Sequence, residues 1–260
     1  MAIISELVLY PIKSCAGMSV RQAVLTSAGL VSPRIRLDTL ELRAPGMLRL
    51  EIPLGLPAPG SEHVRQVTLW DDTVPAYDCD ETTATWFSQV IGVPCRLVRF
   101  HHDARRYSSR KWTGGIEAPN MFSDGYPVLV TGSASLADLN GRLTAAGRAP
   151  LPMNRFRPNI VIDGLDAYEE DYVESFSAGD AVLKPVKPCA RCPIPAVDQA
   201  TGVPGPDPLD ILQTYRAKAE VDVEGDAERI AGSTVSRAQT EVVGVGAEDV
   251  VAEAVADDES

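Results

Sequence analysis

The sequence is poor in cysteine, histidine and aromatic residues, and these shortages exclude whole classes of protein. Its 260 residues include five cysteines and three histidines. Five cysteines are too few, and odd in number, for a disulfide scaffold in a chain of this length. No apolar run approaches the roughly 18–20 residues that a membrane-spanning helix needs. The first residues lack a basic targeting segment, so we expect a globular protein of the reducing cytoplasm, without a membrane partner.

Positive charge is also scarce, because 24 lysines and arginines face 36 aspartates and glutamates for a net charge of −12. This balance argues against a nucleic-acid partner and against a surface drawn to anionic lipid. Most of the excess lies in residues 220–260, and the last aromatic residue is Tyr215. An acidic segment without aromatic residues is typical of a solvated tail. We expect residues 220–260 to be poorly ordered or diverged, although two valine pairs there suit a strand.

Hydrophobic patterning predicts a β-rich α/β fold built around a barrel or curved sheet. Three helices are expected: one from an Asp80 cap to Gly92, one capped by Ser133, and one beginning at Asp207-Pro208. The predicted strands are Ile3–Tyr10, Leu48–Ile52, Val67–Trp70, Val74–Cys79, Cys95–Phe100, Val128–Thr131, Ile160–Ile162 and Ala181–Val186. An exposed basic connection is expected within residues 101–120. It divides the chain into domains 1–105 and 115–219, followed by the tail.

The segment Lys187-Pro188-Cys189-Ala190-Arg191-Cys192 directly follows a predicted strand, where a rigid scaffold can present both thiols. Half of a zinc site is one interpretation, but no second such pair exists. A thioredoxin-like redox pair is another, but prolines follow where a helix is needed. A third is one thiolate that binds a soft metal, favoured by the nearby cations. Two inert loop cysteines remain the simplest alternative.

Cationic and hydroxyl groups stand at other predicted strand ends. Lys13 and Ser14 follow the first strand, and Arg155 and Arg157 precede Ile160–Ile162. Arginine offers a planar fork and lysine a point charge, so such groups suit a phosphate. Ordinary ion pairing at loops is the alternative. The three histidines have no spacing typical of metal ligands and are expected at the surface.

In order along residues 3–216, these segments resemble the MOSC-domain family, named after the C-terminal domain of molybdenum cofactor sulfurase. Within it they are most similar to the branch that reduces N-hydroxylated compounds, which includes the mitochondrial amidoxime-reducing component. The stretches that carry the resemblance are residues 9–15, 122–127, 135–140, 156–160, 187–192 and 208–216. The resemblance implies a MOSC β-barrel with a smaller N-terminal mixed α/β domain.

The resemblance also implies a molybdopterin-type molybdenum cofactor. Cys192 matches the catalytic thiolate that binds molybdenum, and Cys189 matches a cysteine that is not a metal ligand. The family has a serine where Ala190 stands. The matching cofactor-binding positions are Lys13, Ser14, Asp124, Gly125, Tyr126, Arg157, Ala190 and Arg191. Pyridoxal phosphate binding is implied only at the level of the whole family.

The implied reaction is reduction of N-hydroxylated small molecules with electrons from a separate flavin or iron–sulfur protein. No cysteine follows Cys192, so the donor is expected to be external. Two family features are missing: an arginine-containing strand after Leu30, for which Arg34 or Arg36 would have to substitute, and a closing strand after Arg216. A cofactor or sulfur carrier without reductase activity, or an inactive relative, is therefore the alternative.

Overall fold

The computed structural model describes residues 1–31, 39–58, 60, 63–216, 240–244 and 250–253. Two compact units are present. Unit 1 contains Met1–Ser32, Ser108–Ala118 and Ser123–Ser260, and unit 2 contains Pro33–Tyr107 and Pro119–Phe122. These two units are defined by contacts between residues, and their bounds differ from the predicted domain ranges 1–105, 115–219 and 220–260. Those ranges stay a prediction.

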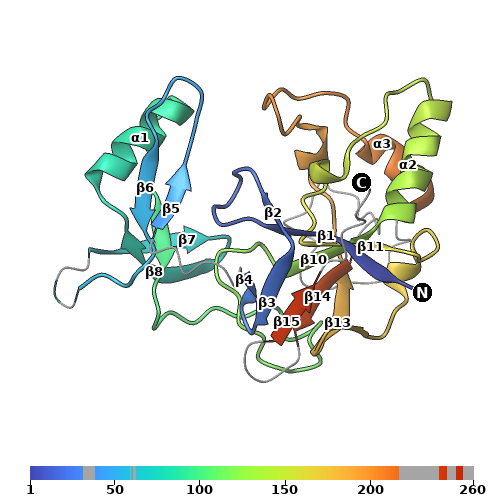
Figure 1. The fold of residues 1–260 in the computed structure, drawn as a ribbon, viewed down its shortest axis with the longest axis horizontal. Helices are drawn as coiled ribbons and strands as arrows, with labels where there is room; N and C mark the ends of the chain where they lie inside the picture. The colour runs from blue at the N-terminus through green and yellow to red at the C-terminus, as the bar shows by residue number, and fades with distance from the viewer. Residues whose placement is uncertain (32–38, 59, 61–62, 217–239, 245–249, 254–260) are drawn as a thin grey trace. The chain divides into compact units, whose positions relative to one another are not determined.

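Unit 1 is built on a seven-stranded mixed sheet (Figure 1). In spatial order its strands are β12 (Phe176–Ala178), β13 (Ala181–Pro188), β14 (Thr240–Gly244), β10 (Val128–Gly132), β11 (Ile160–Asp163), β1 (Ile3–Leu9) and β2 (Met18–Val20). Only β10 and β11 run parallel, joined by a helical crossover. Within the described ranges no pairing joins β12 to β2, so the sheet is open there. The expected β-rich α/β fold is confirmed.

The core of unit 1 comes from alternating apolar side chains that face one side of this sheet. Period-two alternation places every second strand residue on the same face, and this face is buried. Its largest fully buried members include Leu7, Val130, Ile160 and Leu183. Each such side chain contributes about 1.5–3 kcal/mol by leaving water. All the strands predicted from the sequence overlap observed strands.

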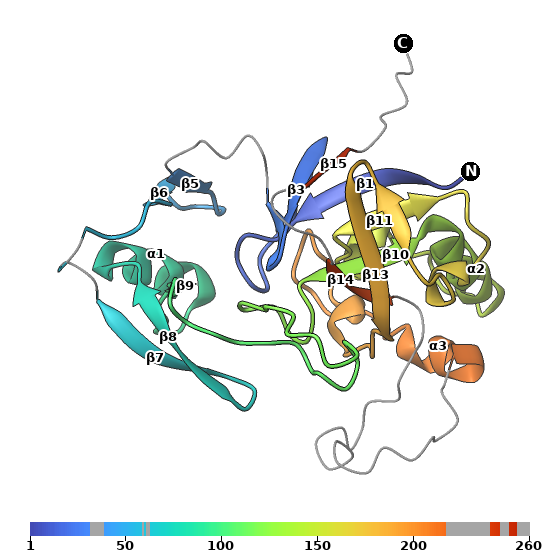
Figure 2. The same ribbon diagram turned by 90° about the horizontal axis from the view of Figure 1, so that it is seen from below.

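Two helices pack together on unit 1 through a second apolar cluster. Helix α2 (Ser133–Ala145) and helix α3 (Leu209–Arg216) bury Leu139, Leu143 and Leu212 with Phe156. Figure 2 shows α2 beside β10 and β11, which its crossover connects. Helix α3 begins at Leu209, one residue after the predicted Pro208, and the Asp207 Oδ1 accepts the Leu209 N–H at 3.0 Å.

Ser133 does not cap α2 as predicted. Gly132 is the N-cap, and its N–H donates to the buried carboxylate of Glu170 at 3.0 Å. Glu170 lies in the short 3₁₀ helix η2 (Glu169–Asp171) and also accepts the Ser135 hydroxyl at 2.5 Å. A carboxylate from a distant segment therefore supplies the acceptor that the sequence pattern assigned to a local serine.

Asn159 joins three strands at the start of β11. Its N–H donates to the Leu129 carbonyl and its carbonyl accepts the Val8 N–H, each at 2.8 Å. Its side chain repeats the connection, because Oδ1 accepts the Leu129 N–H at 3.0 Å and Nδ2 donates to the Val8 carbonyl at 3.1 Å. One residue thus fixes the ends of β10 and β1 against β11. We call it the Asn159 junction.

In the acidic range 220–260 the structure describes residues 240–244 and 250–253, which form two short strands. Strand β14 pairs with both β13 and β10, and β15 (Val250–Glu253) pairs with β3 (Gln22–Thr26), which in turn pairs with β4 (Gly29–Val31). Each of the two contains one of the valine pairs noted in the sequence. Backbone hydrogen bonding is open to any sequence, so the acidic composition did not exclude these pairings.

Unit 2 contains two small sheets and one helix. Helix α1 (Glu81–Ile91) begins at the predicted Asp80 cap, whose Oδ1 accepts the Thr83 N–H at 2.7 Å, and ends at Gly92 in the left-handed region. Of the apolar residues at helical spacing along it, Ala84 and Phe87 are buried, whereas Val90 and Ile91 are exposed. The strands are β5 (Thr39–Leu42), β6 (Leu50–Pro53), β7 (Val64–Leu69), β8 (Asp72–Asp78) and β9 (Val98–Phe100).

The basic connection at residues 101–120 is not simply exposed as predicted. Arg106 is buried, and its Nε donates to Asp72 at 2.7 Å while its Nη1 donates to the Met121 carbonyl at 2.9 Å. Arg34 and Arg36, the possible substitutes for the missing family arginine, lie outside the described residues. None of the helices in the described ranges is both long and apolar enough to cross a bilayer.

Replacing Asn159 with alanine is expected to lower the free energy of unfolding by about 2–4 kcal/mol. The Leu129 N–H and the Val8 carbonyl would each lose a partner, and a buried unpaired group costs about 1–3 kcal/mol. Denaturant unfolding measures the loss. Asn154→Ala, on the exposed turn before it, is the control and should change stability by less than about 0.5 kcal/mol. Equal losses in both variants would contradict the role of the junction.

Asp78 makes unit 2 sensitive to acid. Burial opposes its ionisation, but hydrogen bonds from Arg96 and Arg65 outweigh burial and hold the pKa of Asp78 below its usual range. A lowered pKa stabilises the fold at pH values above the unfolded-state pKa of about 4. This stabilisation is lost as the pH falls through the folded-state pKa. The difference in unfolding free energy between wild type and Asp78→Asn should therefore be full near pH 7 and shrink below about pH 4. A constant difference down to pH 2 would contradict this.

Candidate functional site

Three segments of unit 1 meet at one end of its sheet. They are the loop after β1 (residues 10–17), the turn before β11 (residues 153–159, with the 3₁₀ helix η1 at Met153–Arg155) and the loop after β13 (residues 189–200, with η3 at Ile194–Ala196). Strands β1 and β11 are antiparallel with Leu7 opposite Ile160, so the end of one strand lies beside the beginning of the other. The Asn159 junction holds this arrangement.

Arg157 connects all three segments. Its guanidinium lies over the Tyr10 ring, 4.2 Å from the ring centre, and its Nη1 donates to the Gln199 side chain at 3.2 Å. The same residue has φ 55°, in the left-handed region that non-glycine residues rarely adopt. Ser14, in the loop after β1, has φ 65°. Such strain costs of order 1–3 kcal/mol and concentrates at functional sites.

The charge of Arg157 reaches two acidic groups of the first loop. Burial raises the pKa of Tyr10 to about 12, with Arg157 opposing and Glu6 adding to the rise. Burial likewise raises the pKa of the Cys15 thiol, again with Arg157 opposing. Tyr10 therefore keeps its proton at neutral pH and presents a neutral ring to the cation. This contact of about 4 Å is worth roughly 0.5–2 kcal/mol.

Arg155 has a different task from Arg157. Its Nη1 donates to the Ala196 carbonyl at 2.9 Å and its Nη2 to the Asp198 carboxylate at 2.8 Å. These bonds attach the turn before β11 to the loop after β13. The sequence placed the two arginines in one phosphate-binding group, whereas the structure gives Arg155 the ordinary loop pairing that was the alternative.

Arg191 is buried, and its side chain contacts Cys189 in its own loop and Phe156 in the turn before β11. Its Nη2 donates to the Phe156 carbonyl at 3.0 Å, and its Nη1 lies 3.1 Å from the Cys189 sulfur. Its Nε is buried and has no hydrogen-bond partner within the described part of the chain. A buried guanidinium N–H without an acceptor is costly, and this orphan is one place where an anionic ligand would complete the structure.

Cys192 is exposed and makes no hydrogen bond or ion pair with the residues that the structure describes. Lys187 and Arg191 are the cations that the sequence predicts near the thiols of this loop. Arg191 donates to Cys189, and the Lys187 ammonium lies 5.7 Å from the centre of the Trp112 ring. Cys192 is the open member of the pair, whereas Cys189 is half-buried beside a cation.

The remaining predicted residues form a neighbouring group. The Lys13 ammonium forms an ion pair with the Asp124 carboxylate, and both side chains are largely exposed. Tyr126 is buried against Trp112 and Val186, so it packs beneath the strand that leads to the cysteine loop. Gly125 and Ala190 are half-buried. The structure thus pairs Lys13 with Asp124 and places Arg157 against the same loop after β1.

A cavity of about 250 Å³ lies among the three segments and includes Tyr10, Gly17, Asn154 and Gln199 in its lining. Gly17 is required there, since a Cβ would lie 2.6 Å from both Tyr10 Cε1 and Val8 Cγ1. A second, apolar cavity of about 210 Å³ is lined by residues such as Val130. The site residues predicted from the sequence line neither cavity, but the first cavity lies next to Arg157, whose guanidinium contacts Tyr10 and Gln199 in its lining.

Sequence reasoning did not select Tyr10, Gln199 or Asp198 as site residues. Tyr10 belongs to a stretch that carried the family resemblance, so its position held a usable signal. Gln199 and Asp198 follow the cysteine loop in a stretch without any motif, and only the fold brings them to Arg157 and Arg155.

Comparison with known proteins identifies the family. A family model described as the MOSC domain matches residues 117–251, and one described as the MOSC N-terminal beta barrel domain matches residues 1–37 and 30–94. The chain therefore belongs to the MOSC domain family, as the resemblance indicated. The first match extends across β14 into the acidic range after residue 220.

Individual relatives agree with this assignment. Mitochondrial amidoxime reducing component 2 of Bos taurus is 32% identical, and mitochondrial amidoxime-reducing component 1 of Homo sapiens is 33% identical. Each match covers 82% of this chain and 72% of the relative. Molybdenum cofactor sulfurase of Oryza sativa subsp. japonica is 30% identical over 88% of this chain and 34% of the relative.

Gly17→Ala is expected to lower the free energy of unfolding by about 1–3 kcal/mol, because the new Cβ pushes the Tyr10 ring away from its contact with Arg157. The matched control is Gly141→Ala in α2, where a Cβ meets nothing within 4 Å. That change should be neutral or stabilising by up to about 1 kcal/mol. Denaturant unfolding distinguishes the two, and a neutral Gly17→Ala would contradict the close packing of this loop.

Proposed function

We propose that the chain is a molybdenum-cofactor oxidoreductase that reduces N-hydroxylated small molecules, with Cys192 as the metal ligand. The observation that carries the proposal is the meeting of the strand-end loops around Arg157 in a chain of the MOSC family. The names of the amidoxime-reducing relatives support the substrate class. A third of the residues are shared with them, over most of both chains.

The residues present fit an anionic pterin cofactor. Arg191 has a buried N–H that needs an acceptor, and Arg157 is held half-buried in a strained backbone conformation beside the cavity. An arginine fork and a lysine ammonium are the groups that bind a phosphate. The residues that we propose to hold the cofactor are Lys13, Ser14, Asp124, Gly125, Tyr126, Arg157, Ala190 and Arg191.

Cys192 fits the metal because it supplies a soft, accessible sulfur on a loop fixed at both ends. Thiolate is the protein ligand that suits soft metals, and this sulfur is not engaged by any described neighbour. When bound, the cofactor supplies the two-electron chemistry of the reduction. The chain itself orients the cofactor through Arg157 and Arg191, and Tyr10 keeps its proton at neutral pH as a neutral wall of the cavity.

Electrons for the reaction come, in this proposal, from a separate flavin or iron–sulfur protein. None of the five cysteines is paired in a disulfide, which suits the reducing cytoplasm that we propose for the chain. The names of the amidoxime-reducing relatives describe those proteins as mitochondrial. We do not extend the proposal to pyridoxal phosphate.

A second candidate function is a carrier of the cofactor or of its sulfur, without reductase activity. The similarity to a molybdenum cofactor sulfurase over 88% of this chain favours it. A carrier would use the same Cys192 thiolate and the same basic residues. An inactive relative, the third possibility, would bind no metal. Metal content and turnover together separate these functions.

Cys192→Ser is expected to remove bound molybdenum and the reductase activity together, because the variant lacks the proposed metal ligand. The wild type, expressed in a host that makes the cofactor, should contain about one molybdenum per chain. Cys189→Ser is the matched control from the same loop and should retain most of the metal. Metal analysis gives the content, and turnover of an amidoxime with an artificial reductant gives the activity.

The outcomes assign the function. Metal present in the wild type but no turnover favours the carrier, and a wild type without metal contradicts both functions. Metal retained in Cys192→Ser but lost in Cys189→Ser would assign the ligand to the other cysteine.

A further inference from the structure

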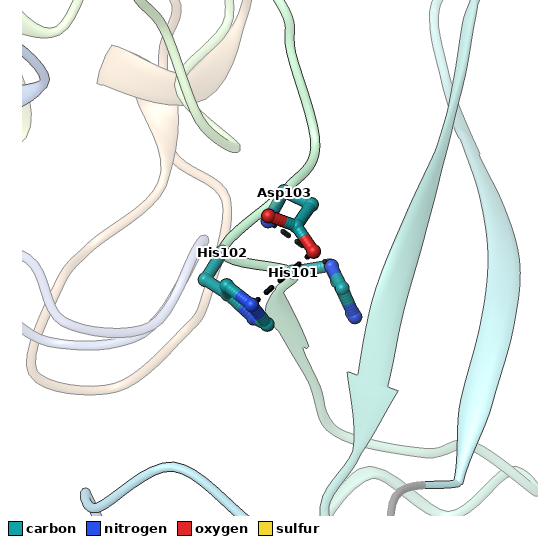
Figure 3. A group of neighbouring side chains, drawn as sticks. All are labelled: His101, His102 and Asp103. Atoms are coloured by element: carbon teal, nitrogen blue, oxygen red, sulfur yellow. Dashed lines mark hydrogen bonds and ion pairs between the residues drawn. The ribbon is translucent and has the colours of Figure 1, made fainter.

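Unit 2 carries a cluster of metal-binding side chains that the proposed function does not use. His101, His102 and Asp103 follow one another directly after β9, and one ligand atom from each lies within 4.8 Å of the other two (Figure 3). The His102 Nε2 and the Asp103 carboxylate are 3.2 Å apart. Consecutive residues rarely converge in this way, because successive side chains of an extended strand point to opposite faces.

The turn that makes them converge is anchored to β8. The hydroxyl of the buried Tyr77 is hydrogen-bonded to the His102 Nδ1, and the Tyr77 ring lies 4.4 Å from that of His101. The two imidazoles stack on each other at 4.6 Å. The Ala104 N–H donates to the His101 carbonyl at 2.9 Å and closes the turn. A hydrogen bond to the second nitrogen of an imidazole is the usual support of a metal-binding histidine.

The hydrogen bonds also leave lone pairs of the required kind. The Asp103 N–H donates to the His101 Nδ1 at 3.1 Å, so this nitrogen carries no proton in the network. Either the Tyr77 hydroxyl or the His102 Nδ1 can be the donor of their shared hydrogen bond, and in the tautomer with the proton on Nδ1 the His102 Nε2 has a lone pair for a metal that bridges it to the Asp103 carboxylate. Unprotonated imidazole and ionised carboxylate are the metal-binding forms.

We propose that His101, His102 and Asp103 bind one Zn²⁺ ion, at a site distinct from the proposed cofactor site in unit 1. Two imidazole nitrogens and one carboxylate oxygen are a typical three-ligand set for zinc, with the fourth position left to water. Ligand atoms at about 2.0–2.2 Å from a tetrahedral zinc are roughly 3.3 Å apart. The His102–Asp103 pair already has this separation, and binding requires that the His101 imidazole give up its hydrogen bond from the Asp103 N–H and turn toward that pair.

The Arg105 guanidinium is bound to backbone carbonyls rather than to the side chains of the proposed metal ligands. Its Nη1 donates to the carbonyls of His102 and Ala104, at 3.1 Å and 2.9 Å. It therefore fixes the turn from the backbone side. The exposed His102 and Asp103 side chains leave the position open to a metal from solvent.

The test is calorimetric titration of Zn²⁺ into the full-length chain after dialysis against a chelator. The wild type should bind one ion at this site, and His102→Ala should weaken that binding at least tenfold. His63→Ala, an exposed histidine of the same unit, is the matched control and should bind as the wild type does. Mg²⁺ and Ca²⁺ should not compete, since they need about six or more oxygen ligands. Unchanged binding in His102→Ala would overturn the proposal, as would the absence of any saturable binding.

Titration with Co²⁺ in place of Zn²⁺ distinguishes metal bound at this site from metal bound by the cysteine pair. Co²⁺ bound by imidazole and carboxylate lacks the intense thiolate-to-metal charge-transfer absorption that cysteine ligands produce. The stoichiometric site should show no such band, and the visible absorption should disappear in His102→Ala. A thiolate band at one equivalent would assign the metal to the cysteines and overturn the proposal, without bearing on whether Cys192 binds molybdenum in the loaded enzyme.

Discussion

Four hydrogen bonds at Asn159 hold the functional end of unit 1 together. Backbone and side chain of this one residue both connect Leu129 of β10 with Val8 of β1, at the point where β11 begins. The strand ends therefore have a fixed register, and the loops that leave them start from fixed positions. Everything proposed for the cofactor site depends on that geometry, because Arg157 lies only two residues before the junction.

The junction also explains how unfavourable backbone conformations persist. Arg157 and Ser14, in the two loops next to it, adopt left-handed conformations that an unsupported loop would relax. Bonds from Arg155 to the loop after β13, and from Arg191 to Phe156, add the support that the turn needs. The result is a set of arginine side chains held in fixed positions in the loops next to the Asn159 junction. Preorganised charge binds an anion without the cost of ordering flexible side chains.

Much of this arrangement was accessible from the sequence, and the limits have physical causes. Strands such as Ile3–Leu9 and the Asp80 cap were predictable because apolar alternation and capping are local properties. The pairing of Arg191 with Cys189 rather than Cys192 was not, since neighbouring residues in a loop can face opposite ways. Glu170 as the acceptor for α2, and Gln199 beside Arg157, are contacts between distant segments that no local pattern encodes.

An experimental structure of the molybdenum-loaded protein tests the central claim most directly, namely that the loops joined at Asn159 form one cofactor site. The account predicts a single cofactor whose phosphate or pterin contacts Arg157 and Arg191 and whose molybdenum is bonded to the Cys192 sulfur. A cofactor that touches Cys192 but neither arginine, or one bound away from the cavity beside Tyr10, would contradict it.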